Sequence, residues 1–271
     1  MREMPERAYH DYRYRLPELP HAYGANVHLL ADPVLLSQLA RLCMPEVVQP
    51  EITMLVRDMY QSLVRMVVAN EFPRVSTAIE TRMFEATPRA VWRGDVLDRS
   101  VRALTVSIAR AGTLPSQIVF ETLVNLIDPA HVRQDHVYMA RVTDEQGRVT
   151  GVSMAGSKIG GDAQDAFVLL PDPMGATGGS LSKTIDLYRE PSARKIISLH
   201  LIITPEFITR LAADHPDLVI YAIRLDRGMS EDAVLQTGLG ELAAAESGLN
   251  EIQYIVPGAG GLGEILNNSF V

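Results

Sequence analysis

Residues 166–180 read Ala-Phe-Val-Leu-Leu-Pro-Asp-Pro-Met-Gly-Ala-Thr-Gly-Gly-Ser, and the chain continues as Leu-Ser-Lys-Thr-Ile-Asp-Leu-Tyr through residue 188. The apolar run at the start is typical of a buried parallel strand, and the last part has the spacing of an amphipathic helix. Between them, Gly175, Gly178 and Gly179 let the backbone turn tightly and approach a ligand. The segment therefore predicts a strand, a turn of small residues and a helix.

This turn has the chemistry of a phosphate-binding site. The first N–H groups of the following helix would point into it with positive partial charge, and Thr177 and Ser180 add hydroxyl donors. Open α/β sheets bind ligands at this end of their strands. Asp172 stands there too, and its carboxylate is suited to accept hydrogen bonds from the two vicinal hydroxyls of a ribose. An ordinary tight turn with a capping serine is the alternative that a glycine-rich loop alone leaves open.

Outward from this turn, apolar runs of strand length alternate with helical patterns. Near-continuous Val, Ile and Leu in the strands favours an α/β fold whose parallel sheet is covered by helices on both faces. We expect strands at 103–109, 137–142, 166–170, 196–203, 218–223 and 252–256, and helices at 34–44, 52–70, 114–127, 180–189 and 205–214.

The string Asp-Pro-Met-x-Ala-Thr-Gly-Gly-Ser at 172–180 resembles the phosphoribosyl pyrophosphate (PRPP) loop of uracil phosphoribosyltransferases, with Gly175 where a larger apolar residue is usual. The resemblance extends over about residues 26–271 and implies a type I phosphoribosyltransferase fold with a hood made from the N- and C-terminal parts. It also implies substrate contacts for the whole turn, which comprises Asp172, Pro173, Met174, Gly175, Ala176, Thr177, Gly178, Gly179 and Ser180.

Two arginines fall on family positions that face the pyrophosphate of PRPP. Val-Ser-Ile-Ala-Arg-Ala-Gly at 106–112 resembles one such segment and places Arg110 there, and Val-Tyr-Met-Ala-Arg at 137–141 resembles the next strand, which ends at Arg141. Planar guanidinium groups pair well with phosphate oxygens, so two of them converging on a diphosphate make chemical sense. For either arginine alone, a surface ion pair is the alternative.

The segment Tyr-Ile-Val-Pro-Gly-Ala-Gly-Gly-Leu-Gly-Glu at 254–264 resembles the family's strand and loop at the uracil site. Ile255, Gly260 and Leu262 stand where the family presents backbone groups to uracil. The acid that follows the second glycine in the family, and that helps to hold PRPP, is Gly261 here. Glu264 is a candidate substitute if the loop is arranged differently.

The chain divides into an N-terminal extension at 1–26, expected either to stay mobile or to drape over a partner, and a single domain at 27–271. An Ala- and Glu-rich insertion near 228–247 interrupts a connection that is normally short. Its composition predicts a separate helix, which would reshape or cover the base site.

Composition excludes several classes of protein. The formal net charge is −8, which argues against a nucleic-acid-binding surface. One cysteine allows neither a disulfide within the chain nor a zinc site of thiolates. The charged start has no apolar signal region, and no run reaches the roughly 18 apolar residues of a membrane span. We therefore expect no membrane contact and a cytoplasmic location.

The resemblance implies an enzyme that transfers ribose 5-phosphate from PRPP to uracil, giving UMP and pyrophosphate in pyrimidine salvage. Mg²⁺ would accompany PRPP and be held mainly by the substrate, because only Asp172 offers a nearby carboxylate, so we expect no metal site built from the protein. No catalytic residue can be assigned. We expect a homodimer or homotetramer. The alternative is a diverged homologue that uses another base, or one that binds PRPP or a nucleotide as a regulatory protein without turnover.

Overall fold

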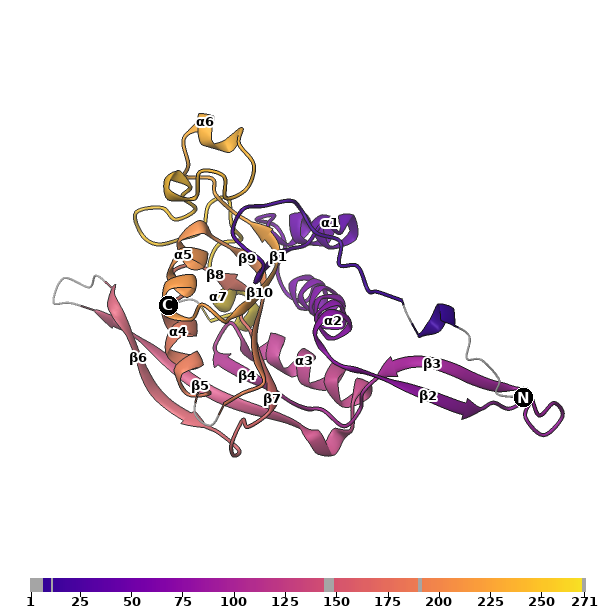
Figure 1. Ribbon diagram of the computed structural model, residues 1–271. Helices are drawn as coiled ribbons and strands as arrows, with labels where there is room; N and C mark the ends of the chain where they lie inside the picture. Colours follow the sequence, from indigo (N-terminus) through magenta and orange to yellow (C-terminus); the bar gives the residue numbers. More distant parts are fainter. Residues whose placement is uncertain (1–6, 11, 144–148, 190–191, 270–271) are drawn as a thin grey trace.

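The computed structural model describes residues 7–10, 12–143, 149–189 and 192–269. An eight-stranded sheet in the order β1-β10-β9-β7-β4-β5-β6, with β8 beside β9, forms its centre (Figure 1). Neighbouring strands are parallel except β5 and β6, which confirms the expected parallel sheet. The strands are β1 (Val27–Leu29), β4 (Arg102–Ala109), β5 (Val132–Thr143), β6 (Val149–Lys158), β7 (Ala166–Pro171), β8 (Met174–Gly175), β9 (Lys195–Ile203) and β10 (Val219–Leu225).

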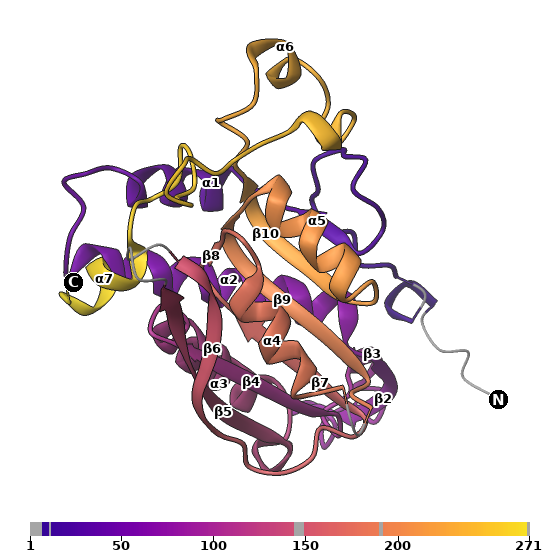
Figure 2. The same ribbon diagram turned by 90° about the vertical axis from the view of Figure 1, so that its left-hand side faces the viewer.

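Helices cover both faces of this sheet, as expected. On one face lie α1 (Pro33–Leu42), α2 (Glu51–Glu71) and α3 (Thr113–Leu126), and on the other α4 (Gly179–Asp186) and α5 (Pro205–Asp214) (Figures 1 and 2). The apolar stripe of α2 recurs at helical spacing, which buries one side of that helix against the strands. The two faces carry separate apolar cores, so the sheet is buried on both sides and the carboxyl ends of its strands are left for a ligand.

The strand expected at 252–256 is wrong. This stretch forms a turn with one isolated bridge, between Leu249 and Ile255. The Asn250 carboxamide oxygen accepts hydrogen bonds from the backbone N–H groups of Ile252 (3.1 Å) and Tyr254 (2.9 Å). These bonds compete with any strand ladder, because an asparagine side chain satisfies the backbone locally.

The helix expected at 228–247 is also wrong. Its regular structure is one turn of helix, α6 (Asp232–Leu235), and a short 3-10 turn, Ala243–Ala245. The Arg227 guanidinium donates to the carbonyls of Leu235 (3.3 Å) and Thr237 (2.7 Å), so it holds the chain in a compact loop rather than a helix. Figure 1 shows the insertion projecting from the body.

One antiparallel ribbon was not expected from the sequence. Strands β2 (Arg74–Glu80) and β3 (Val91–Leu97) pair with each other and extend away from the sheet (Figure 1). Polar residues such as Ser76, Thr77, Arg93 and Asp95 interrupt both strands, so neither has the continuous apolar run that marks the central strands. The ribbon is therefore easily missed by a search for buried strands.

The N-terminal extension lies along other parts of its own chain. The His10 ring contacts Asp95 of β3 at 3.0 Å, and the Leu19 N–H donates to the Leu29 carbonyl at 2.8 Å. The Tyr23 hydroxyl donates to Glu246 in the insertion.

In the described ranges, no helix has both the length and the apolar character needed to cross a bilayer.

Candidate functional site

The turn at 172–180, called the phosphate turn from here on, has the predicted order of strand, turn and helix. It leaves β7, forms the two residues of β8 beside β9, and enters α4 at Gly179. Gly178, just before the helix, has φ of +74°, a conformation that glycine adopts without steric cost. The first N–H groups of α4 lack acceptors within the helix and point back into the turn. This geometry suits a phosphate.

The turn is braced from β9 and α5. Thr204, the N-cap residue of α5, donates its hydroxyl to the Ala176 carbonyl (2.7 Å) and its N–H to the Gly175 carbonyl (3.1 Å). A Cβ added at Gly175 would stand 2.8 Å from Ile203 Cγ2 and 3.0 Å from the Phe207 ring. Phe207 therefore fills the space that a larger residue at 175 would take, which explains this departure from the family pattern.

Asp172 stands at the carboxyl end of β7 as predicted. Burial raises the pKa of its carboxyl to about 6, while a hydrogen bond from the Met174 N–H (3.3 Å) works in the opposite direction. His200 Nδ1 donates to the Asp172 backbone carbonyl at 2.6 Å, and burial lowers the pKa of His200 to about 3, so the ring is neutral. In α2, the Tyr60 hydroxyl donates to the Leu199 carbonyl at 3.1 Å. Sequence reasoning missed both His200 and Tyr60, because nothing in their own segments marks them.

Arg110 follows β4 directly, and its turn lies beside that of Asp172. A Cβ at Gly112 would stand 2.9 Å from the Pro171 carbonyl oxygen, so the two strand ends are in close contact. The Arg110 guanidinium donates to Ser269 Oγ at 2.7 Å and lies 3.6 Å from Glu264 Oε1. Arg141 belongs to β5, but its side chain lies outside the described part of the structure. Its predicted role stays a prediction.

The loop at 254–262, called the base loop, is fixed at several points. The side chains of Ile255 and Leu262 belong to the core, which leaves their backbone groups for the predicted contacts with a base. The Gly258 N–H donates to Oδ2 of the buried Asp226 at 2.8 Å. Asp226 is thus a positioning residue for the loop that sequence reasoning missed. Gly260 has φ of +65°, and no atom lies within 4 Å of a Cβ added there.

The C-terminal helix α7 (Leu262–Asn267) follows the base loop and lies beside the turn that contains Arg110. Its N-cap residue is Gly261, whose φ is −78°, so this position does not require glycine for a left-handed backbone. A Cβ added at Gly263 would stand 3.3 Å from Ala111 Cβ, so the start of α7 packs on the residue after Arg110. The structure thus brings together Arg110, the turn that bears Asp172, and the base loop.

The insertion touches the base loop where it begins and projects outward from there. The Gly228 N–H donates to the Val256 carbonyl and the Met229 N–H to the Ser247 carbonyl, both at 2.9 Å, so the two ends of the insertion lie side by side. Farther out, the insertion contacts the N-terminal extension, where the Ala22 N–H donates to the Leu239 carbonyl at 2.8 Å. Of these contacts, the hydrogen bond to the Val256 carbonyl is the one through which the insertion touches the base loop.

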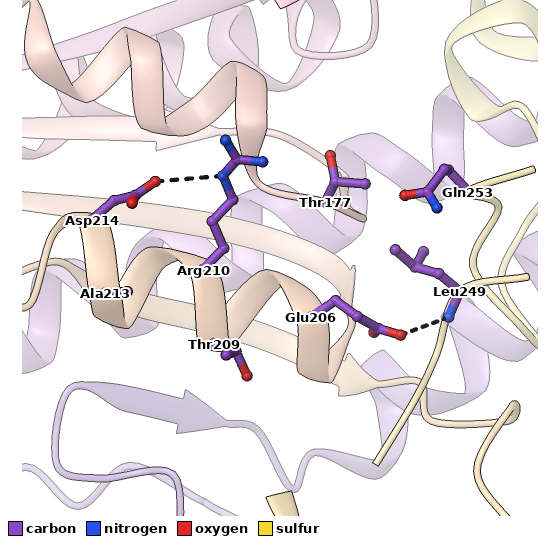
Figure 3. A pocket seen from close by; sticks show the side chains of 8 residues that line it. All are labelled: Thr177, Glu206, Thr209, Arg210, Ala213, Asp214, Leu249 and Gln253. Carbon is purple, nitrogen blue, oxygen red and sulfur yellow. Dashed lines mark hydrogen bonds and ion pairs between the residues drawn. The ribbon is translucent and has the colours of Figure 1, made fainter. Parts of the chain in front are cut away.

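An open hollow of about 620 Å³ adjoins the phosphate turn at Thr177 (Figure 3). Figure 3 shows the Arg210 side chain extending toward Thr177 from α5, with its Nε 3.4 Å from Asp214 Oδ2. Neither Arg110 nor Asp172 lines this hollow, so it lies beside the grouped site residues. The lining residues are Thr177, Glu206, Thr209, Arg210, Ala213, Asp214, Leu249 and Gln253.

Comparison with known families shows the family to which the chain belongs. The model of the family described as "Uracil phosphoribosyltransferase" matches residues 29–245. This chain belongs to the uracil phosphoribosyltransferase family. The match confirms the resemblance stated from the sequence, and with the parallel sheet it confirms the type I phosphoribosyltransferase fold.

Individual relatives are similar over different extents. A uracil phosphoribosyltransferase of Chlamydia muridarum (strain MoPn / Nigg) is 44% identical over 84 residues, which span 31% of this chain and 28% of that protein. The AQ2163 protein from Aquifex aeolicus has a similar structure, with a TM-score of 0.67 and 18% identity, over 89% of this chain and 97% of that one. An adenine phosphoribosyltransferase from Trypanosoma brucei gives a TM-score of 0.45 and 12% identity over 83% and 94% of the two chains.

Proposed function

We propose that this protein is a phosphoribosyltransferase that transfers ribose 5-phosphate from PRPP to a ring nitrogen of uracil. The bond from the ribose to the nitrogen forms, the bond from the ribose to the diphosphate oxygen breaks, and the proton of that nitrogen passes to pyrophosphate or water as UMP and pyrophosphate leave. The proposal assigns the reaction to pyrimidine salvage in the cytoplasm. Membership of the family supports the class of reaction.

The observation that carries the proposal is the position of three groups at one edge of the sheet. The phosphate turn offers the helix N–H groups of α4 to the 5-phosphate, and Asp172 offers a carboxylate to the ribose hydroxyls. Arg110, on the adjacent strand end, offers a guanidinium to the diphosphate. PRPP carries a 5-phosphate, ribose hydroxyls and a diphosphate, and each of these has one of the three groups as its proposed partner.

In this arrangement the protein acts mainly by positioning and by electrostatics. As the diphosphate leaves, positive charge develops on the ribose and negative charge on the leaving group. A fixed guanidinium beside the leaving group stabilises that negative charge without reorganisation. The base loop would hold uracil through its backbone groups and align the attacking nitrogen with the ribose.

A magnesium ion bound to PRPP would neutralise part of the diphosphate charge. Among the residues that the structure describes, no group of three or more His, Cys, Asp or Glu side chains could hold a metal ion. The site offers two separate carboxylates, Asp172 and the Arg110-paired Glu264, so we propose an ion carried mainly by the oxygens of the substrate.

A second candidate function is supported by the glycine at 261. A homologue that has lost the family's acid could use another base, or could bind PRPP or a nucleotide without turnover. The intact phosphate turn supports ligand binding under either hypothesis. Turnover of uracil distinguishes them.

The test is to incubate the protein with PRPP, Mg²⁺ and each of uracil, cytosine, adenine, hypoxanthine and guanine, and to measure nucleotide and pyrophosphate. We expect UMP with uracil and no product when ribose 5-phosphate replaces PRPP. Product with another base only would identify a changed specificity. Binding of PRPP or UMP in calorimetry without product from any base would support the regulatory alternative.

A further inference from the structure

The carboxylate of Glu264 occupies the space beside Gly261. A Cβ added at Gly261 would stand 2.5 Å from Glu264 Oε2, closer than a Cβ can approach an oxygen. Both residues lie at the start of α7, where the Glu264 N–H donates to the Gly261 carbonyl at 3.0 Å. A side chain at 261 and the present position of the Glu264 carboxylate are therefore mutually exclusive.

The same carboxylate is directed toward the arginine at the end of β4. Glu264 Oε1 lies 3.6 Å from Arg110 Nη2, and Ser269 Oγ accepts from Arg110 Nη1 at 2.7 Å. The Glu264 side chain is 27% exposed and that of Arg110 44%. Contact of Gly263 with Ala111 fixes α7 against the arginine's own turn, so the two charged groups are held near each other by the backbone.

We propose that Glu264 is a positioning residue for Arg110, and that it supplies from one helical turn later the carboxylate that residue 261 lacks. The inference deepens the proposed function, since it rests on Arg110 as the group that binds the diphosphate. Glu264 and Ser269 each engage one terminal nitrogen of the guanidinium. The Ser269 carbonyl accepts a second hydrogen bond from Nη1 at 3.4 Å. An arginine has five N–H donors, so two remain for phosphate oxygens.

A long side chain that is already ordered loses less conformational entropy when a ligand binds. Removing Glu264 therefore weakens diphosphate binding, although it also removes a negative charge from the site. The direction of this change in diphosphate affinity distinguishes positioning of Arg110 from electrostatic repulsion. If repulsion between Glu264 and the diphosphate outweighed the positioning, the same change would strengthen binding.

The experiment measures the affinity of the full chain for inorganic pyrophosphate with Mg²⁺, for PRPP and for UMP by calorimetry. Glu264→Ala is expected to lower the affinity for pyrophosphate and PRPP about fivefold, which is the upper end for an ion pair of this exposure. The affinity for UMP should stay unchanged, because UMP has no diphosphate. Glu121→Ala is the control, because it breaks the Arg57–Glu121 pair between α2 and α3, whose arginine is 40% exposed against 44% for Arg110.

A second pair of variants tests the shared space. Gly261→Asp alone is expected to weaken pyrophosphate binding, because its Cβ displaces the Glu264 carboxylate. The double variant Gly261→Asp with Glu264→Ala is expected to return to within about twofold of wild type, since one carboxylate then replaces the other. Unchanged or tighter pyrophosphate binding in Glu264→Ala, or losses that simply add in the double variant, would overturn the inference. Because pyrophosphate itself is the probe, these outcomes are independent of whether uracil is the base.

Discussion

At the scale of single residues, Asp172 links stability to function. Its carboxyl has a pKa of about 6, against 3.8 for an ordinary aspartate, because burial disfavours the charge. The folded state therefore binds this proton more tightly than the unfolded chain, and folding stability falls as the pH rises from about 4 to about 6. A ribose that donates its hydroxyl hydrogen bonds to the carboxylate would offset this loss.

We expect Asp172→Asn to remove this pH-dependent loss while it weakens PRPP binding. The variant's free energy of unfolding, relative to wild type, should be higher at pH 8 than at pH 4 by about 1–3 kcal/mol. PRPP affinity should fall about tenfold or more, since a hydrogen bond to a charged group contributes roughly 1.5–3 kcal/mol. Denaturant titrations at both pH values and calorimetry measure the two effects. Unchanged PRPP affinity would remove Asp172 from the site.

Arg110 differs from Asp172 in that its proposed ligand is the diphosphate alone. We expect Arg110→Ala to lower the affinity for PRPP by about tenfold or more and the affinity for UMP by less than about twofold, because only PRPP carries the diphosphate. Calorimetry with both ligands measures the two losses. Equal losses would show that the arginine serves mainly to hold the C-terminal segment through Ser269 and Glu264. From the sequence, Arg141→Ala is expected to behave in the same way.

At the scale of elements, the five strands β4, β5, β7, β9 and β10 and the helices α1 to α5 could be predicted because each carries its own signal, whereas β1, β6 and β8 were missed. A run such as 166–170 is apolar enough to mark a buried strand, and α5 begins and ends where its sequence pattern predicted, at Pro205–Asp214. The phosphate turn was predictable for the same reason, since its glycines and helix start lie in one segment. The failures, at 228–247 and 252–256, depend on side chains such as Arg227 and Asn250 that bind backbone groups of neighbouring residues.

The supports of the site could not be predicted, because they join segments far apart in the chain. Asp226 fixes Gly258, and His200 binds the carbonyl of Asp172 across 28 positions in the sequence. Neither residue belongs to a motif of its own. Spacing along the chain shows which groups belong to one turn, whereas contacts between strands appear only with the three-dimensional fold.

Packing between β8 and α5 gives a prediction at this scale. Since Phe207 fills the space beside Gly175, Gly175→Leu should overpack the core and lower the free energy of unfolding by about 1–3 kcal/mol. Phe207→Ala should leave a cavity that costs about 3–5 kcal/mol. In the double variant the leucine enters the cavity, so the loss should be smaller than the sum of the single losses by at least about 1 kcal/mol. Additive losses in denaturant unfolding would mean that the two positions do not share one space.

At the scale of the whole molecule, the β2–β3 ribbon has an apolar face that the described part of the chain covers in part, where Tyr9 lies against Gly94. Cross-strand partners place Val75 opposite Val96 and Ile79 opposite Trp92, and alternation along each strand puts these pairs on the same face. The side chains of Val75, Ile79 and Trp92 are 43%, 52% and 42% exposed. The other face carries the polar residues Ser76, Arg93 and Asp95, and Asp95 binds His10 of the N-terminal extension.

A two-stranded ribbon is at best marginally stable in water by itself, so its apolar face needs cover from another surface. The expected homodimer or homotetramer supplies one, because a second copy of this chain brings an identical apolar face. We therefore expect the protein to be larger than a monomer in light scattering, and Ile79→Asp to shift it toward the monomer by placing a charge in the contact. Ala78→Asp is the matched control, because the adjacent residue points to the opposite, polar face. A monomeric wild type, or the same shift from both variants, would show that this face of the ribbon does not join the copies.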